Sequence, residues 1–452
     1  FRAMWEHSGT GPFAEEGWAK SLDILQANGL NAIVPNLWWA GLAYYPSDYL
    51  PVAETVAKYG DQMEECVREA HARGIEVHAW KVNWNLGNAP QDFIDKLRAE
   101  GRTMVDVKGE PIDWLCPSHP LNYQLELDTM LEPVRKYDVD GIHFDYIRYL
   151  GEHVCYCPGC LERFQADTGL NVTDWPAQCY SGDLHDPYRQ WRCDQITRLV
   201  RTTSEESRKL KPWVRISAAV FSNYPSTRDS IGQDWLLWVK EGYLDFVCPM
   251  DYTDSNSGFR RTVARQVAQV NGRVPLCPGI GASAPGQPAD MTITQIEIAR
   301  ELGADGFTVF QLDRSKAVDH VPALGRGMLK PATYTPTFAP KIAFNLPGEP
   351  SEEDGLVHLP RGAQVEIPLR LVTLGASRSE VTGLAGSVEL QTTTGDALGT
   401  LLALPPKAGD EATLSVKPRD GRLRLAAVGE LTLADGSKRP FVVRSAPFAF
   451  DR

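Results

Sequence analysis

The chain has 452 residues, 43% of them hydrophobic and 23% charged, which is typical of a globular protein that can bury a large core. Its formal net charge of −12 at pH 7 argues against nucleic acid or an anionic membrane as partner, because phosphate binding requires a basic patch, and it favours a weakly charged ligand such as a sugar polymer. No apolar run approaches the length of about 18 residues that predicts a transmembrane helix.

The first 330 residues alternate between apolar runs and amphipathic segments. The apolar runs predict strands at residues 2–8, 31–39, 75–84, 141–149, 214–221, 244–253, 274–281 and 306–313. Several helical segments between them end in glycine, as at Gly29, Gly74 and Gly303, which is typical of a helix C-cap before a strand. The strands are apolar almost throughout, as parallel strands covered by helices are. Eight such units predict a (β/α)8 TIM barrel. An open doubly wound sheet is the alternative, and it is weakened because no strand is followed by a G-x-G-x-x-G turn.

The rest of the chain has a different pattern. Residues 331–342 are rich in Pro and Thr and predict a linker. Residues 343–452 contain short strand-like runs separated by Gly, Asp and Ser turns, which predict a small all-β sandwich. This part has no Cys and a single His, His358, so we expect no chemistry there.

The barrel prediction places the active site at the carboxyl ends of the strands. The residues at those ends are rich in carboxylates, aromatic rings and amides, the set that binds a sugar and cleaves a glycosidic bond. Aromatic faces stack on pyranose rings, and amide or cationic groups bond to hydroxyls. The predicted substrate contacts are Glu6, Asn36, Trp38, Trp39, Lys81, Trp84, Arg148, Tyr252, Asp254, Gln311 and Asp313.

Asp145 and Asp251 form the predicted catalytic pair. Each ends a strongly apolar strand, and strands 4 and 6 lie on the same side of a barrel mouth. We expect Asp145 to act as nucleophile or base and Asp251 as the general acid, with a pKa raised by the apolar surroundings. Glu6 or Asp313 is the alternative second carboxylate. If Asp145 is not catalytic, it is expected to be an N-cap for the next helix or an ion-pair partner of Arg148.

Three cysteines, Cys155, Cys157 and Cys160, lie in the sequence CYCPGC just after the fourth strand. A tetrahedral zinc site requires a fourth ligand, and Cys116 lies in the preceding βα connection, which is adjacent in a barrel. Four thiolates leave no open position, so we expect a structural zinc that fixes the long segment 151–195 beside the mouth. The alternatives are other ligands, a disulfide or reduced thiols; the candidate replacement ligands are His119, His153, Cys179 and Cys193.

Residues 113–151, with the motifs DWLCPSHP and DGIHFDYIRYLG, resemble the glycosyl hydrolase 10-like family of bacterial proteins. The resemblance covers most of residues 1–330. It implies a TIM barrel that acts on glycans, in some members peptidoglycan glycan strands, with Asp145 as the expected catalytic residue. It also implies an extracytoplasmic location, because the family often acts in the cell envelope. The start FRAMWEHSG lacks an initiator Met and an apolar segment and is typical of a trimmed chain or a mature product, so the N-terminus does not indicate the compartment.

The thiol pattern is similar to the structural zinc cluster of family 42 β-galactosidases, in which one Cys precedes a C-x-C-x2-C loop after strand 4. Those enzymes carry an Asn-Glu pair at the end of strand 4, whereas this chain has Phe144 and Asp145. The resemblance therefore implies the zinc cluster but not β-galactosidase activity.

Together these features predict an extracytoplasmic glycoside hydrolase with a structural zinc. Two alternatives remain open. A glycan-binding barrel without turnover would bind oligosaccharide and release no reducing ends. A zinc hydrolase would lose activity on chelation while still folded.

Overall fold

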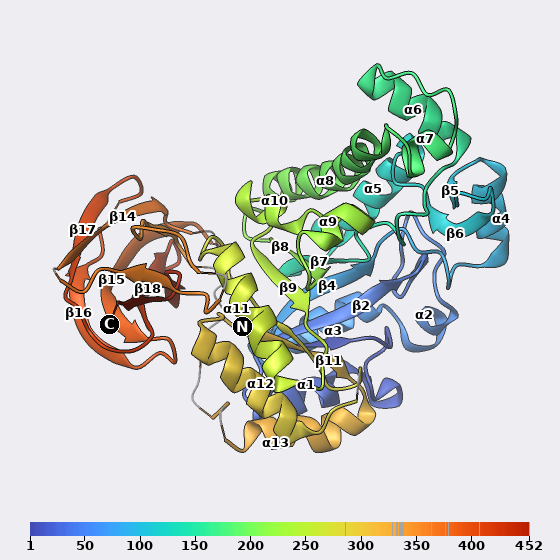
Figure 1. The fold of residues 1–452 in the computed structure, drawn as a ribbon. Coiled ribbons are helices and arrows are strands. Elements are labelled where there is room, and N and C mark those ends of the chain that lie inside the picture. Colours follow the sequence, from blue (N-terminus) through green and yellow to red (C-terminus); the bar gives the residue numbers. More distant parts are fainter. Residues whose placement is uncertain are drawn as a thin grey trace.

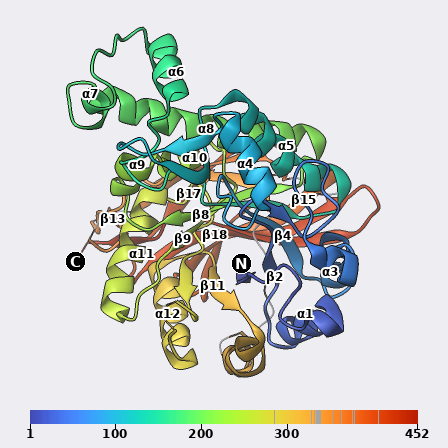
Figure 2. The ribbon, with the colours of Figure 1, turned by 90° about the vertical axis from the view of Figure 1, so that its right-hand side faces the viewer.

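The computed structural model describes residues 1–451 except positions 285, 328, 331–332, 334–338, 352, 363, 376, 378 and 406. Within these residues, parallel strands form a closed barrel, because β1 pairs with both β2 and β11. The eight barrel strands are β1 (Arg2–Glu6), β2 (Ala32–Trp39), β4 (Glu76–Val82), β7 (Gly141–Asp145), β8 (Arg215–Phe221), β9 (Phe246–Met250), β10 (Gly279–Gly281) and β11 (Phe307–Leu312). The predicted TIM barrel is confirmed, and the open sheet is wrong. Figure 2 shows the barrel along its axis with helices around it.

Helices cover the outside of the barrel. They are α1 (Gly17–Ala27), α3 (Gln62–His71), α5 (Pro120–Lys136), α8 (His185–Leu210), α10 (Trp235–Lys240), α11 (Asn256–Val270), α12 (Ala289–Leu302) and α13 (Val321–Gly325). Their ends follow local chemistry: the carboxylate of Asp61 accepts hydrogen bonds from the first turn of α3, and the hydroxyl of Ser255 does so for α11. Gly29, Gly74 and Gly303 adopt the predicted left-handed conformation after helices. No described helix is long and apolar enough to cross a membrane.

Short helices and strands lie in the connections that follow the barrel strands. They are β3 (Leu42–Ala43), α2 (Glu54–Tyr59), α4 (Gln91–Ala99), the hairpin β5 (Thr103–Val105) and β6 (Pro111–Leu115), α6 (Pro158–Thr168), α7 (Ala177–Tyr180) and α9 (Ser226–Ile231). The segment 151–195, predicted as a long loop, contains α6, α7 and the first turns of α8. Figure 1 shows α6 and α7 projecting from the barrel near the β5–β6 hairpin.

Strand residues alternate between two apolar cores. Side chains such as Trp5, Val34 and Cys248 fill the barrel interior, whereas Met4, Ile33 and others pack between strands and helices. A shift of one position along a strand therefore moves a side chain from the interior to the helix layer. This alternation decides which predicted site residues reach the mouth.

The C-terminal part is all β, as predicted. Its strands are β12 (Lys341–Phe344), β13 (Val357–Leu359), β14 (Val365–Thr373), β15 (Val381–Thr392), β16 (Ala397–Ala403), β17 (Glu411–Val416), β18 (Leu423–Leu433), β19 (Lys438–Arg444) and β20 (Phe448–Phe450). One sheet has the order β12-β14-β17, the other contains β13, β20, β18, β15 and β16 with β19 beside β18, and both contribute to one core. The predicted linker is largely outside the described residues, and its last residues begin β12. Figure 1 shows this sandwich to the left of the barrel, on the side away from the β5–β6 hairpin, and Figure 2 shows it behind the barrel.

Candidate active site

Asp145 ends β7 and lies at the barrel mouth with only 5% of its surface exposed. Its carboxyl Oδ1 accepts a hydrogen bond from the backbone N–H of Tyr146 at 2.7 Å. Burial raises the pKa of Asp145 to about 6, against the opposing effects of this hydrogen bond, the nearby Arg148 charge and the Trp80 indole. A carboxyl with this pKa exchanges its proton near neutral pH, as acid–base catalysis requires.

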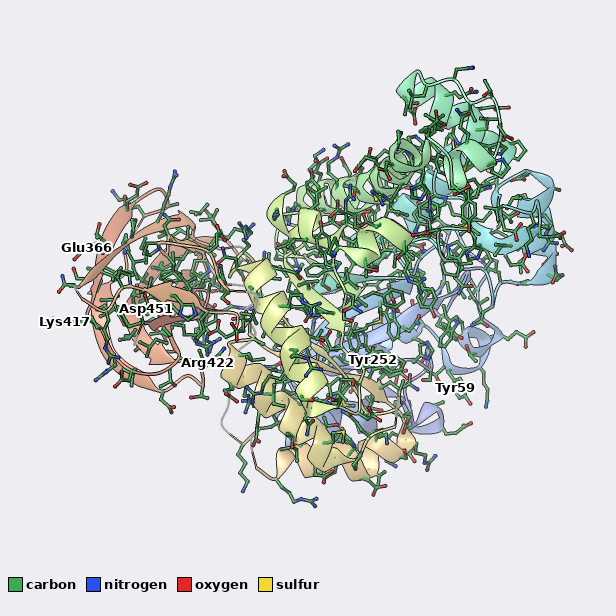
Figure 3. The ribbon with its side chains drawn as sticks, viewed as in Figure 1. Tyr59, Tyr252, Glu366, Lys417, Arg422 and Asp451 are labelled. Atoms are coloured by element: carbon green, nitrogen blue, oxygen red, sulfur yellow. The ribbon has the colours of Figure 1, made fainter. Side chains whose placement is uncertain are left out.

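Aromatic rings line the interior beneath and beside this carboxyl. His7 stacks on Trp80 with ring centroids 5.2 Å apart, and Tyr252 stacks on Phe310 at 5.4 Å. Trp5 meets Tyr252 edge-on at 6.4 Å and closes the bottom of the mouth. Figure 3 shows Tyr252 within the barrel. Ring faces of this kind offer stacking surfaces to a sugar.

Arg148 lies next to Asp145 and is held by three aromatic rings. Its guanidinium carbon is 4.6 Å from the ring centroids of Tyr146 and Phe221 and 5.9 Å from that of Trp114. Its Nη1 donates to the carbonyl of Tyr149 at 3.3 Å, and among the described residues its Nε has no partner. The predicted alternative of a close Asp145–Arg148 ion pair is not formed within the described chain. Phe221 is 38% exposed and forms an accessible apolar edge.

Asp251 follows β9 and is 4% exposed. Its Oδ1 accepts a hydrogen bond from Nε2 of Gln266 on α11 at 2.7 Å, whereas Oδ2 has no partner among the described residues. Burial raises its pKa to about 8, which the Gln266 hydrogen bond opposes. The carboxyls of Asp145 and Asp251 thus have different neighbours, and Asp251 is oriented towards α11. The Oδ2 atom of Asp251 is left unpartnered among the described residues, and the pairing of the two carboxyls stays a prediction.

The alternative carboxylates have other partners. Glu6 is fully buried and accepts hydrogen bonds from the backbone and hydroxyl of Ser8; burial raises its pKa to about 7. Asp313 is partly exposed and accepts from the backbone N–H of Lys316 at 2.8 Å, as a helix N-cap does. Asp254 is exposed beyond β9. None of these acids contacts Asp145 in the described structure.

Three predicted substrate contacts lie in the helix layer. Lys81 is 2% exposed, and its Nζ forms an ion pair with Glu126 of α5 at 2.7 Å. Trp38 is 1% exposed and its indole donates to the Tyr45 hydroxyl. Trp84 is fully buried. These side chains are occupied inside the protein and present no surface to a sugar.

The mouth instead includes residues that their position near a strand end does not identify. Trp80 and Phe310 were not among the predicted contacts, nor were Trp114 and Tyr146. Trp80 lies one residue before Lys81, and in the register of β4 and β7 it is opposite His143, an interior residue. The alternation of interior positions around the barrel is the signal that could have selected Trp80 instead of Lys81. Trp114 required knowledge of the β5–β6 hairpin, which brings it 5.6 Å from the Tyr146 ring.

Three other predicted contacts remain near the mouth. Asn36 is buried, shares the interior register with Trp80, and neither of its amide atoms has a partner among the described residues. Trp39 is partly exposed and packs on His7, and Gln311 is partly exposed at the end of β11. The exposed parts of Trp39 and Gln311 can contact a ligand that enters the mouth.

Four cysteines form one buried cluster beside this mouth. The Sγ atoms of Cys116, Cys155, Cys157 and Cys160 all lie within 4.8 Å of one another. Cys116 Sγ is 3.8 Å from Cys157 Sγ and 3.5 Å from Cys160 Sγ, and the last two are 3.4 Å apart. Tetrahedral sulfur ligands at about 2.3 Å from zinc stand about 3.8 Å apart, so the donor set fits that ion. Nη2 of Arg163 lies 3.7 Å from Cys116 Sγ and adds positive charge to a thiolate site.

The replacement ligands considered from the sequence lie outside the cluster. His119 caps α5 by accepting from the Leu121 N–H, and Cys193 donates to the carbonyl of Arg228. Cys116 directly follows β6, which carries Trp114, and Cys157 caps α6. The cluster therefore joins the hairpin to α6 next to the Tyr146–Arg148 side of the mouth.

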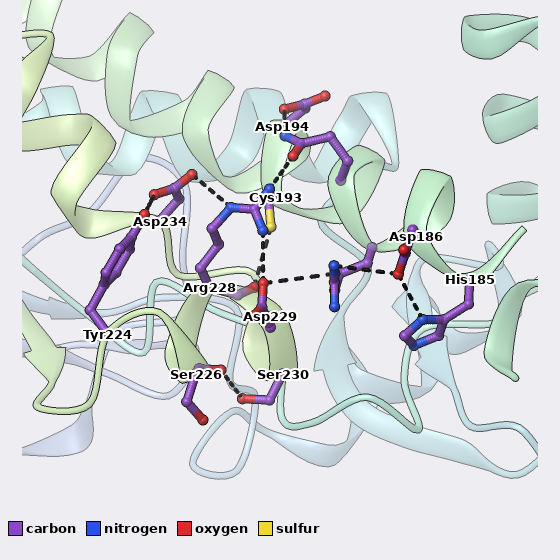
Figure 4. Close-up of polar contacts among 12 residues, drawn as sticks. His185, Asp186, Cys193, Asp194, Tyr224, Ser226, Arg228, Asp229, Ser230 and Asp234 are labelled. Atoms are coloured by element: carbon purple, nitrogen blue, oxygen red, sulfur yellow. Dashed lines mark hydrogen bonds and ion pairs between the residues drawn. The ribbon is translucent and has the colours of Figure 1, made fainter.

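A second brace lies between α8 and the segment after β8. Arg228 of α9 contacts Asp229 at 2.7 Å and Asp234 at 3.3 Å, and it donates to Gln190 of α8. The hydroxyl of Tyr224 also donates to Asp234, at 3.0 Å (Figure 4). This network fixes the connection that follows Phe221 at the mouth.

The sequence matches the family model described as glycosyl hydrolase-like 10 over residues 13–279. Curated relatives include glycosyl hydrolase YngK of Bacillus subtilis, 22% identical over 266 residues, which cover 53% of this chain and 49% of the relative. Glycosyl hydrolase DigH of Escherichia coli K12 is 24% identical over 295 residues, which cover 56% of this chain and 60% of the relative. The chain therefore aligns with about half to three-fifths of the length of these relatives.

Solved structures share the fold at low identity. The glycoside hydrolase domain of PgaB (BpsB) from Bordetella bronchiseptica superposes with a TM-score of 0.59 at 16% identity, covering 72% of this chain and 97% of that domain. The catalytic domain of β-amylase from Paenibacillus polymyxa has a TM-score of 0.52 at 14% identity, covering 74% of this chain and all of that domain. At these identities the likeness establishes the fold alone.

Proposed function

The chain belongs to the glycosyl hydrolase-like 10 family, and from this premise we propose that it is a glycoside hydrolase that cleaves O-glycosidic bonds at its barrel mouth. The observation that carries the proposal is the Asp145 carboxyl, which is buried among aromatic rings at the end of β7 and has a pKa raised to about 6. Glycosidic cleavage requires a titratable carboxyl, and the aromatic side chains around Asp145 can stack on the sugar.

The two predicted carboxyls have complementary protonation states. At pH 7 Asp145, with a pKa of about 6, is mostly ionised and suits a nucleophile or base. Asp251, with a pKa of about 8, is mostly protonated and suits a general acid. The proposal requires that the Oδ2 atom of Asp251, which has no partner among the described residues, reaches the glycosidic oxygen.

The proposed substrate is a poly- or oligosaccharide in an extracytoplasmic compartment. Trp39, Tyr252 and Phe310 would stack on sugar rings, and Asn36, Arg148 and Gln311 would bond to hydroxyl or acidic groups. The names of the relatives support a glycan substrate, and peptidoglycan glycan strands are one member of that class. Arg148 is free of a close carboxylate partner in the described chain, which suits a contact with the ligand.

The four-cysteine cluster is proposed to hold a structural zinc ion. Its four thiols are 0–3% exposed and leave no open coordination position, so the ion would brace the hairpin and α6 without taking part in cleavage. Arg163 would offset the negative charge of the thiolates.

The test is a screen of wild type, Asp145→Asn and the exposed control Asp92→Asn against envelope, host and plant glycans. We expect wild type and Asp92→Asn to release reducing ends equally from one glycan class. Asp145→Asn should be slower by at least about 100-fold yet bind the same glycan within a few-fold by calorimetry. Full activity of Asp145→Asn would contradict the assignment.

Asp251→Asn tests whether Asp251 is the general acid. If Asp251 protonates the leaving group, this variant loses much more activity on a natural glycan than on an aryl glycoside whose leaving group needs no proton. The alternative function is a glycan-binding barrel, and the observation that supports it is the hydrogen bond that holds the Asp251 carboxyl to Gln266. It would be established if wild type binds a glycan and releases no reducing ends from any member of the panel.

A further inference from the structure

A cavity of about 110 Å³ lies between the barrel and the C-terminal sandwich. By the same measure, one water molecule requires about 10–15 Å³. The barrel lines it with Arg215, Asp245 and Asp305, and the C-terminal part lines it with Lys341 and Arg444. These barrel residues stand at the start of β8, before β9 and before β11, so the cavity is at the opposite strand ends from Asp145. Figure 3 shows Arg422 on the barrel-facing side of the sandwich, with Glu366 and Lys417 on its far side.

The sandwich brings three cations to this junction that have no close partner. Arg424 is 4% exposed, and among the described residues its Nε and Nη1 make no hydrogen bond. Arg444 lines the cavity, and its Nε also has no partner there. No described carboxylate lies within ion-pair distance of Arg424, Arg444 or Lys341. Burial, together with the charge of Arg444, lowers the pKa of Arg424 to about 9.

The carboxylates of the cavity are engaged by the barrel. Asp245 accepts from the backbone N–H of Ile216 at 2.9 Å and pairs with Arg208 at 3.1 Å. Asp305 accepts from the backbone N–H of Leu276 at 3.2 Å. Asp305 attracts Arg424 and Arg444 only from beyond ion-pair distance. The junction therefore has an excess of positive charge.

We propose that this junction cavity binds a small oxyanion, with a phosphate-like or carboxylate group held by Arg444 and Lys341 and attracted by Arg424 behind them. Arg424 is buried and Arg444 is partly buried, so their charges require compensation, and a guanidinium binds phosphate or carboxylate through two parallel N–H donors. Apolar neighbours such as Phe246 and Val443 line other parts of the cavity. The anion would bridge the sandwich to the barrel, and this role is independent of the proposed cleavage at the mouth.

The test is calorimetry and thermal unfolding of the full chain in sodium phosphate and in sodium acetate, each against sodium chloride at equal ionic strength. We expect saturable binding of at least one oxyanion and a melting temperature that rises with its concentration. Arg444→Gln should weaken binding at least tenfold, and Lys341→Gln should weaken it severalfold. Arg370→Gln removes the same charge from an exposed site on β14 and should bind as wild type does.

Two outcomes would overturn the proposal. One is the absence of saturable binding of either oxyanion to wild type. The other is unchanged affinity in both Arg444→Gln and Lys341→Gln while these proteins remain folded. Asp145→Asn should bind the oxyanion as wild type does, so a failure of the glycoside hydrolase assignment leaves this test intact.

Discussion

At the scale of single residues, the face of a strand decides the role of a side chain. Trp80 points into the barrel beside Asp145, whereas its neighbour Lys81 forms a buried ion pair with Glu126 behind the barrel wall. The same alternation separates the interior Trp5 from Glu6, which is buried on the other face. For Lys81 and Glu6, the parity of the strand position therefore directs the side chain away from the barrel interior.

Lys81 tests this distinction. In Lys81→Met, the Glu126 charge stays buried without its partner, so the free energy of unfolding should fall by about 3–5 kcal/mol, measured by urea titration. The exposed control Lys96→Met should change it little, and Lys81→Met combined with Glu126→Leu should recover part of the loss. Glycan affinity should be unchanged where the variant is folded. A stable Lys81→Met protein that has lost glycan affinity would instead make Lys81 a substrate contact.

Among the secondary-structure elements, those that form the mouth include short helices and strands that are not part of the repeating βα units of the barrel. The β5–β6 hairpin supplies Trp114, and the cysteine cluster at its end connects it to α6. The network around Arg228 similarly ties α9 to α8. The first brace adds to the buried aromatic packing of this region, to which Phe164, Tyr188 and Trp191 contribute.

Metal content tests the first brace. We expect about one zinc ion per chain, released when the thiols are modified and measured with a colorimetric chelator. Cys157→Ser should lose the ion and lower the melting temperature by about 5–10 °C, because the hairpin and α6 are no longer joined. Cys193→Ser, a buried thiol outside the cluster, should keep the zinc. Immediate loss of activity in a folded, chelated protein, restored by metal, would indicate a catalytic ion instead.

At the scale of the whole molecule, buried titratable groups set how stability depends on pH. Burial raises the pKa of Asp145 to about 6, of Glu6 to about 7 and of Asp251 to about 8. It lowers that of His143 to about 3 and that of His7 to about 4. The acids bind more protons in the folded state and weaken stability as pH rises towards 8, whereas the histidines strengthen it as pH rises towards 6.5. The two effects oppose each other below pH 6.5, and of these five groups only the acids act above it.

The free energy of unfolding should therefore fall between pH 6.5 and 8.5, by about 2 kcal/mol from Asp251 alone. Urea titrations across this range measure the slope. Asp251→Asn should flatten it, because the amide cannot ionise, while Asp254→Asn on the exposed loop should leave it unchanged. A slope that is the same in Asp251→Asn and wild type would show that this carboxyl is not buried as described.

The sequence by itself determined the barrel, the all-β C-terminal part, the four-cysteine cluster and the placement of Asp145 at the mouth. These depend on local signals: apolar runs with helical spacers, a C-x-C-x2-C loop and the last residue of a strand. The face that each strand presents depends on the closed barrel, and for this reason the sequence predicts Lys81, Trp38 and Trp84 at the mouth although the structure buries them elsewhere. Only the tertiary structure decided the orientation of Asp251 towards α11 and the meeting of cations at the barrel floor. The physical reason is that parity, strand register and contacts between distant segments depend on how the barrel closes, and no single stretch of residues contains that information.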